Sequence, residues 1–295
     1  MQSLKDKFNF IERYSQFHSV STLCRILNVS RSAYYNRKQV GRREIKDREL
    51  FRIILKIHTK HKSMGLDSIY HHLKNQQMKI GRGRIHRIMK NFNIHSCRHN
   101  AFKHTTNSNH SKPIAPNLLN QCFQAPAPNV AWVGDITYIR TVEGWLYLAI
   151  VKDLCTKKIV GYSFSNRIDS NLVCEALKMA LRRQNPPFNL IFHSDRGSQY
   201  CSDSFRKLLF DNRIIQSMSR KGNPYDNAVA ENFFSCLKSE FVNLHFFRSR
   251  AEAEVGIFRY IEAYYNNIRP HSSINWLPPN SFEHSFKFQS NSTIY

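Results

Sequence analysis

The 295-residue sequence contains no apolar run of the roughly 20 residues needed to span a bilayer, and no hydrophobic stretch follows its N-terminal lysines. We therefore expect neither a membrane segment nor a secretory signal. The seven cysteines are odd in number and scattered, and no C-x-x-C pair occurs. This usage argues against a disulfide framework or a structural zinc site and favours a reducing, cytoplasmic compartment.

Acidic residues are scarce, since 44 Lys and Arg stand against 21 Asp and Glu and give a formal net charge of +23. Residues 1–112 hold 24 basic and 6 acidic side chains, whereas residues 113–295 hold 20 and 15. A basic first third followed by a nearly balanced remainder indicates one region that binds a polyanion and another with a separate task. With 41% hydrophobic residues, the chain can bury cores in about two domains of roughly 150 residues each.

The basic first third has helical periodicity. A short helix over Ser21–Leu27, a turn and a second helix capped by Ser30 outline a helix-turn-helix, although a helical hairpin without DNA contacts has the same pattern. Three further helices are predicted, at Glu49–Lys60, Asp67–Asn75 and Arg84–Asn91. The cations of this region either face solvent or bind phosphates, and we expect DNA contacts from these five: Arg31, Arg37, Arg82, Arg84 and Arg87.

The pattern divides the chain into five segments. We expect a helix-turn-helix-like segment at 1–45, a helical DNA-binding domain at 46–95, a basic linker at 96–125, an α/β core at 126–285 and a tail at 286–295. The linker region contains one cysteine and several histidines, but their spacing fits no zinc pattern, so no zinc is predicted. These residues are His95, Cys97, His99, His104 and His110.

The core has the alternation of an α/β fold. The predicted elements are strands at Val130–Ile139, Trp145–Val151 and Ile159–Phe164, a helix at Ser170–Arg183, a strand at Leu190–Ser194, a helix at Ser202–Asp211, a strand at Ile214–Met218 and a helix at Tyr225–Phe241. The last helix follows the breaker Gly222-Asn223-Pro224. This order predicts a mixed sheet with flanking helices.

Three acidic residues stand where packing alone does not explain them. Asp135 interrupts a strand, Asp195 follows a buried strand, and Glu231 lies within the last predicted helix on the same face as Lys238. Asp195 could instead cap a turn, and Glu231 could pair with Lys238 or face water. Carboxylates brought together repel unless they hold cations, and Mg²⁺ or Mn²⁺ take such oxygen ligands. Two such ions about 4 Å apart can promote displacement at a phosphodiester, so the pattern predicts a nucleic-acid enzyme.

The spacing and the flanking residues resemble a known family. There are 59 residues between Asp135 and Asp195 and 35 between Asp195 and Glu231, a spacing similar to the DDE signature of integrases and transposases. The segments around these acids, at 132–138, 193–200 and 222–228, together with Tyr265-Asn266-Asn267-Ile268-Arg269-Pro270-His271, resemble the second-frame (OrfB-type) transposases of bacterial insertion sequences. The resemblance extends from Asn28 to Pro278.

The resemblance implies a ribonuclease H-like catalytic core preceded by an all-α, HTH-like DNA-binding region. It assigns Asp135, Asp195 and Glu231 as the catalytic, metal-binding triad for two Mg²⁺ or Mn²⁺ ions and Lys238 as a contact to the transferred DNA end. His193 either orients this site or is an ordinary buried histidine. The implied reaction is strand cleavage and transfer at the ends of the element.

The resemblance also implies partners and leaves two alternatives. We expect a first-frame product or frameshift fusion, a homo-oligomer in the synaptic complex and a location at the bacterial nucleoid. One alternative is a catalytically decayed DNA-binding repressor or competitor of transposition. The other is a nuclease of the same fold that cuts DNA without joining it.

Overall fold

The computed structural model describes residues 3–97, 112–220, 226 and 228–292 of the chain, without the side chains of 38–44 and 287–292. The chain divides into two compact units, Met1–His61 with Gly83–Ile94 and Lys62–Arg82 with His95–Tyr295, which are described separately. Three linker histidines, His99, His104 and His110, and the predicted breaker at 222–224 lie outside the described residues. None of the helices in the described ranges combines the length and the apolar composition needed to span a bilayer.

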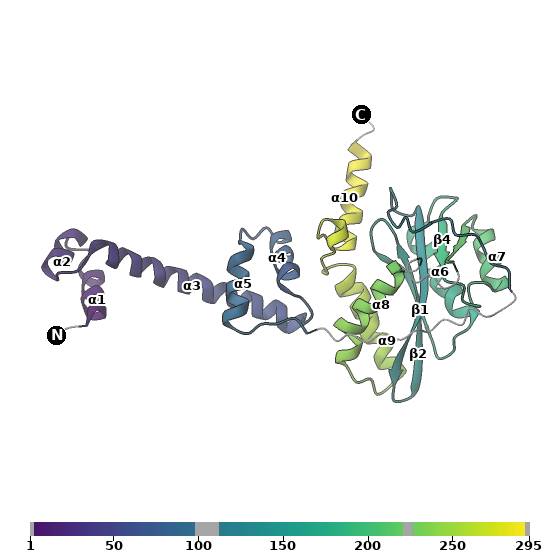
Figure 1. Ribbon diagram of the computed structural model, residues 1–295, viewed down its shortest axis with the longest axis horizontal. Coiled ribbons are helices and arrows are strands. Elements are labelled where there is room, and N and C mark those ends of the chain that lie inside the picture. Colours follow the sequence, from purple (N-terminus) through teal and green to yellow (C-terminus); the bar gives the residue numbers. More distant parts are fainter. Residues whose placement is uncertain (1–2, 98–111, 221–225, 227, 293–295) are drawn as a thin grey trace. The chain divides into compact units, whose positions relative to one another are not determined.

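The first unit begins with three helices (Figure 1), α1 (Leu4–Tyr14), α2 (Val20–Ile26) and α3 (Arg31–Lys60). A serine caps the start of each helix: Ser3, Ser19 and Ser30. The cap at Ser30 and the short helix before it confirm the predicted helix–turn–helix outline. Helix α1 was not predicted, although Ser3 and Asp6 form a capping box that marks its start. Apolar side chains from the three helices share one small core: Phe8, Ile11, Leu23, Cys24 and Tyr34.

The prediction of two separate helices between Ser30 and Lys60 was wrong, because α3 is one helix of 30 residues. The segment between the predicted helices has no proline and one glycine, Gly41, which costs a helix only about 1 kcal/mol relative to alanine. The second half of α3 lies against α5 (Arg82–Asn91). There Phe51 stacks on Phe92 with ring centroids 3.8 Å apart, which fixes one face of α3 toward the protein.

The second unit is built on a five-stranded sheet in the order β3-β2-β1-β4-β5. Its strands are β1 (Ala131–Thr141), β2 (Gly144–Asp153), β3 (Ile159–Ser165), β4 (Ile191–Ser194) and β5 (Ile215–Met218). The first three strands are antiparallel, whereas β4 is parallel to both β1 and β5. This arrangement confirms the predicted mixed sheet.

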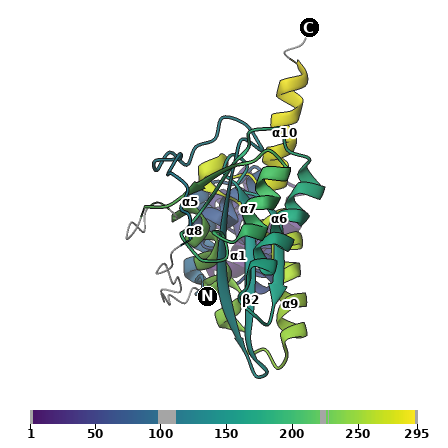
Figure 2. The same ribbon diagram turned by 90° about the vertical axis from the view of Figure 1, so that its right-hand side faces the viewer.

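Helices cover both faces of the sheet. Helix α6 (Ser170–Gln184) packs on β2 and β3, and α7 (Asp203–Asp211) packs beside it on β5 (Figure 2). On this face Trp132, Leu177 and Phe205 belong to one buried core. On the opposite face, Ala131 and Val133 pack with Ala230 of α8 (Ala228–Glu240). Alternate residues of β1 therefore face different helices.

The structure continues beyond Phe241, where the predicted elements end. The additional elements are η2 (Val242–Leu244), α9 (Arg250–Arg259), the π-helical turn η3 (Tyr260–Tyr265), η4 (Ser272–Ile274) and α10 (Pro279–Ser292). The same unit includes α4 (Leu66–Asn75). The ring of His71 on α4 stacks on Trp276 with centroids 4.3 Å apart, and Asn75 donates to the Trp276 carbonyl oxygen at 3.0 Å.

Candidate active site

Asp135 lies on the central strand and is only 8% exposed. Because side chains alternate along a strand, it is on the same face as Ala131 and Val133, the face that α8 covers. One carboxylate oxygen, Oδ1, accepts a hydrogen bond of 2.8 Å from the backbone N–H of Ile136. A carboxylate is therefore held on the central strand of the sheet, opposite a helix.

Asp195 follows β4 directly, at the carboxyl end of a strand that is parallel to β1. Its Oδ1 accepts a hydrogen bond of 2.9 Å from the N–H of Gly197, so the turn fixes its orientation. Burial raises the pKa of Tyr200 well above its usual value, and the charges of Asp135 and Asp195 both add to the rise. The register of the two strands relates the aspartates directly, because Asp135 and Asp195 each stand two positions beyond the paired residues Val133 and His193.

Helix α8 carries Glu231 in its first turn and Lys238 in its last. The two positions are seven residues apart, nearly two full turns, and therefore share a face about 10 Å apart along the axis. Lys238 Nζ lies 5.0 Å from the ring centroid of Tyr138. Burial lowers the pKa of Lys238, and the charge of Asp135 opposes that shift. The face of α8 that bears both residues is therefore directed toward the end of β1.

The described residues contain no group of three or more His, Cys, Asp or Glu side chains that could hold a metal ion. The donor chemistry of Asp135 and Asp195 nevertheless fits a hard divalent cation, because both offer carboxylate oxygens beside one buried tyrosine. Glu231 does not complete a three-ligand cage with them in this arrangement. The structure thus brings the two aspartates together and directs the glutamate-bearing helix toward them.

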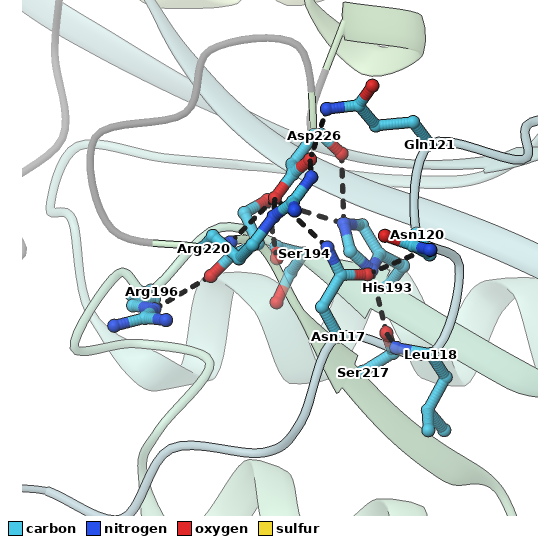
Figure 3. Close-up of polar contacts among 11 residues, drawn as sticks. Asn117, Leu118, Asn120, Gln121, His193, Ser194, Arg196, Ser217, Arg220 and Asp226 are labelled. Carbon is cyan, nitrogen blue, oxygen red and sulfur yellow. Dashed lines mark hydrogen bonds and ion pairs between the residues drawn. The ribbon is translucent and has the colours of Figure 1, made fainter.

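A buried carboxylate that the sequence analysis did not single out lies just before α8. Asp226 is 1% exposed and is surrounded by donors (Figure 3). Its Oδ2 accepts from the backbone N–H of Arg220 at 2.8 Å, from Arg220 Nε at 3.1 Å and from Asn117 Nδ2 at 3.0 Å. Its Oδ1 accepts from Arg220 Nη2 at 3.0 Å and from Gln121 Nε2 at 3.2 Å. The hydrogen bond from Arg220 is the largest cause that holds the pKa of Asp226 far below its usual value.

His193 connects this carboxylate to the sheet. It is fully buried on β4, two residues before Asp195, and its Nε2 lies 2.9 Å from the backbone carbonyl oxygen of Asp226. A carbonyl oxygen only accepts, so Nε2 carries the proton and Nδ1 accepts from the hydroxyl of Ser217 at 2.8 Å. The same hydroxyl oxygen accepts from the N–H of Leu118 at 2.9 Å. His193 is therefore a satisfied, neutral histidine, and burial lowers its pKa.

The C-terminal end of α8 is also held by a buried charge. Glu240, 9% exposed, accepts from Arg269 at 2.7 Å between Oε1 and Nη2 and at 3.0 Å between Oε2 and Nε. The hydroxyl of Tyr260 donates to the same carboxylate at 2.9 Å. Asn266 hydrogen-bonds both backbone groups of Ile159 at the start of β3. The segment Tyr265–His271, singled out in the sequence, thus anchors α8 and the sheet.

Most of the arginines predicted to contact DNA have partners within the protein. Arg84 and Arg87 both pair with Asp47 at 2.7 Å, and Arg82 pairs with Asp67 at 2.7 Å. Arg37 donates to the backbone oxygen of Lys5 and to Asn9 and lies over the ring of Phe8. Arg31 is exposed at the start of α3. Acidic side chains of the protein therefore offset the positive charge of three of the five predicted contacts, Arg82, Arg84 and Arg87.

A different cationic surface lies on α3. Arg52, Lys56 and Lys60 recur every four residues on its exposed side, opposite the buried Leu50 and Ile54, and have no ion pair with any described residue. We call these three residues the α3 cationic face. The sequence signal for it was present, because residues four apart lie on one side of a helix. It was missed because the predicted contacts were assigned to arginines of other segments.

Comparisons with known proteins agree with this geometry. Two family descriptions named "Integrase core domain" match residues 125–224 and 212–279, and an "HTH-like domain" matches residues 44–102. The "Insertion element IS600 uncharacterized 31 kDa protein" of Shigella sonnei is 43% identical over 270 residues, which is 90% of this chain and 98% of that protein. "Transposase InsF for insertion sequence IS3A" of Escherichia coli (strain K12) is 38% identical over 283 residues, 94% of this chain and 98% of that protein.

Solved structures with similarity to the chain are more distant. A simian T-cell lymphotropic virus intasome in complex with PP2A regulatory subunit B56 gamma has a TM-score of 0.46 at 17% identity and covers 72% of this chain and 74% of that one. The trimeric form of the HTLV-2 integrase catalytic core domain in complex with magnesium has a TM-score of 0.44 at 15% identity, over 55% of this chain and 100% of that one. From the two sequence relatives and the matched domains, we conclude that this chain belongs to the insertion-sequence transposases that combine an HTH-like domain with a DDE-type integrase core.

Proposed function

We propose that Asp135, Asp195 and Glu231 are the catalytic residues of this transposase and hold two Mg²⁺ or Mn²⁺ ions. In this proposal the enzyme cleaves DNA strands at the ends of its element and transfers them to a target. The observation that carries it is that Asp135 and Asp195 each stand two positions beyond the paired residues Val133 and His193 of neighbouring parallel strands. Helix α8, which bears Glu231 and Lys238, packs on the face of β1 to which Asp135 belongs. Coordinated ions supply activation of the attacking oxygen and neutralise charge at the phosphodiester.

The side chains of the protein contribute positioning and charge. Asp135 is fixed by its strand and by the N–H of Ile136, and Asp195 is fixed by the turn at Gly197, so both carboxylates are oriented before DNA binds. Lys238, whose Nζ lies over the ring of Tyr138 on β1, would neutralise a phosphate of the transferred DNA end. Glu231 would complete the ligand set when DNA and metal are present.

The test is an assay of nicking and joining with oligonucleotides that carry the element's ends, in Mg²⁺ or Mn²⁺. Asp135→Asn, Asp195→Asn and Glu231→Gln should each abolish both products and leave DNA retention intact. Asp211→Asn, an equivalent change at an exposed position at the end of α7, is the control and should remain active. Wild-type activity in all three triad variants would refute the assignment. Nicked but never joined DNA from the native chain would instead indicate a nuclease.

We further propose that the α3 cationic face binds phosphates of the DNA, and that the exposed Arg31 at the opposite end of α3 contributes a separate contact. Its three cations have no ion pair with a described residue, and like charges four residues apart destabilise a helix by about 0.2–0.5 kcal/mol per pair. A polyanion that follows the helix offsets this repulsion. We also propose the division of the chain into five segments given above, from the helix-turn-helix-like segment at 1–45 to the tail at 286–295.

The partners of the reaction are proposals as well. A first-frame product or fusion would supply recognition of the element's ends, and more than one copy of the chain would act in the synaptic complex at the bacterial nucleoid. Light scattering of the protein with and without end DNA and first-frame product tests this. A single copy in every mixture would contradict it.

A further inference from the structure

Asp226 joins the two parts of the chain that carry Asp195 and Glu231. Asp226 lies five positions before Glu231 of α8, and His193 of β4 lies two positions before Asp195. One hydrogen bond of 2.9 Å, from His193 Nε2 to the Asp226 carbonyl oxygen, connects them. This bond therefore links the strand that precedes Asp195 to the segment that precedes α8, the helix of Glu231.

The segment at 117–121, which precedes β1, adds further hydrogen bonds to the same network. Asn117 and Gln121 each donate to a different oxygen of the Asp226 carboxylate, and the N–H of Leu118 donates to Ser217, which in turn hydrogen-bonds His193 (Figure 3). Leu119 of this segment is packed in the core between β1 and α8. Residues 117–121 thus pack and hydrogen-bond with the residues that hold the start of α8 in place.

We propose that Asp226 is a positioning residue and that Asn117 and Gln121 form a strap which, through Asp226, sets the place of Glu231 relative to Asp195. The inference rests on the proposed role of Glu231 as a metal ligand. The carboxylate is fixed from three sides, by Arg220, Asn117 and Gln121, and its carbonyl is fixed from the fourth by His193. Loss of the strap lets the first turn of α8 shift while Glu240 still anchors its other end.

A purely structural role for this network makes a different prediction. If Asp226 served only the stability of the fold, weakening its partners would lower the melting temperature and the amount of active enzyme, without a change in metal affinity. A positioning role moves the glutamate, so metal binding weakens and added metal restores activity. Partners behind metal ligands typically change metal affinity by about 10-fold to 100-fold when they are lost.

The experiment compares the full-length variant Asn117→Ala/Gln121→Ala with Asn212→Ala/Asn280→Ala. The control pair also removes one donated hydrogen bond per site, to Leu208 and to Asn267, in places unconnected with Asp226. Mn²⁺ titration of the protein bound to end DNA should show a half-saturating concentration raised roughly 10-fold in the strap variant and unchanged in the control. In strand transfer, kcat should fall while KM for DNA stays the same, and excess Mn²⁺ should restore most of kcat.

Asp226→Asn and Asp226→Glu provide an independent second test. The Asp226→Asn variant keeps the shape of the side chain but removes the negative charge that pairs with Arg220, whereas Asp226→Glu keeps the charge. A higher Mn²⁺ affinity in Asp226→Glu than in Asp226→Asn supports the proposal. Unchanged Mn²⁺ affinity in a folded strap variant would overturn it. If Glu231→Gln remains active, the proposed function fails; if Glu231→Gln is inactive and the strap variant matches its control, only the positioning inference fails.

Discussion

Neutralising the α3 cationic face should change how DNA binding depends on salt. The variant Arg52→Gln/Lys56→Gln/Lys60→Gln replaces three exposed cations by a residue of similar helix propensity, so α3 is expected to stay folded. It also removes two like-charge contacts between residues four apart. A loss of DNA affinity in this variant therefore reflects lost contacts and not an unfolded helix.

The magnitude follows from counterion release. Each phosphate neutralised in duplex DNA contributes about −0.9 to the slope of log K against log salt, so three lost contacts reduce the steepness by about 2.7. Between 50 and 200 mM salt, the native chain should then lose about 40-fold more affinity than the variant. Fluorescence anisotropy of a labelled duplex over a salt series gives both slopes.

A matched control separates a local contact from a general change in net charge. Arg167→Gln/Arg182→Gln/Lys207→Gln removes the same charge from exposed positions on the second unit, and we expect a smaller change in slope. Equal slopes for the native chain and the α3 variant would refute the proposed contacts. An equally large effect in the control would show that only total charge matters.

Three further predictions concern stability. Arg269→Met removes the cationic partner of the buried Glu240 and should lower the free energy of unfolding in urea by about 3–5 kcal/mol, and a loss under 1 kcal/mol would contradict the buried pair. Gly161→Ala places a Cβ against the backbone of α6 and should cost about 1–3 kcal/mol by thermal unfolding, whereas Gly83→Ala, whose Cβ meets open space, should not destabilise the chain. Burial lowers the pKa of Lys152 to about 7, so the unfolded chain binds the extra proton between pH 7 and 10.5 and stability rises with pH across that window. The stability gained by Lys152→Met should therefore be largest below pH 7 and shrink toward pH 10, and a gain independent of pH would contradict the burial of a charged lysine.

Two motif residues outside the triad, Asp226 and Arg269, make contacts at the two ends of α8. Asp226 belongs to one of the segments that resemble the transposase family, and Arg269 belongs to another, yet neither carries a predicted catalytic role. In the structure both hold buried polar contacts at opposite ends of the same helix. Burying charge is costly unless every group is paired, so such residues are fixed in place together with their partners.

Hydrophobic periodicity was sufficient to predict the strands of the sheet and the two helices on one of its faces. The predicted strands and the helices over Ser170–Arg183 and Ser202–Asp211 agree with β1 to β5, α6 and α7 within a few residues, because alternation and helical spacing are local properties. The same local signals did not show that α3 continues through Gly41, since one glycine costs less than the contacts that the longer helix makes. The C-terminal helices were not predicted at all.

The amino-acid sequence by itself indicated a nucleic-acid enzyme and a mixed sheet and singled out three acidic positions, since each is expressed in residue type, spacing and strand alternation; its resemblance to a known family indicated the transposase class. Only the tertiary structure decided which partners these residues have. The structure placed Asp135 and Asp195 beside Tyr200, paired Arg84 and Arg87 with Asp47, and tied Asp226 to residues about 105 positions earlier in the chain. Contacts of such sequence separation depend on the packing of whole elements, which local periodicity does not specify.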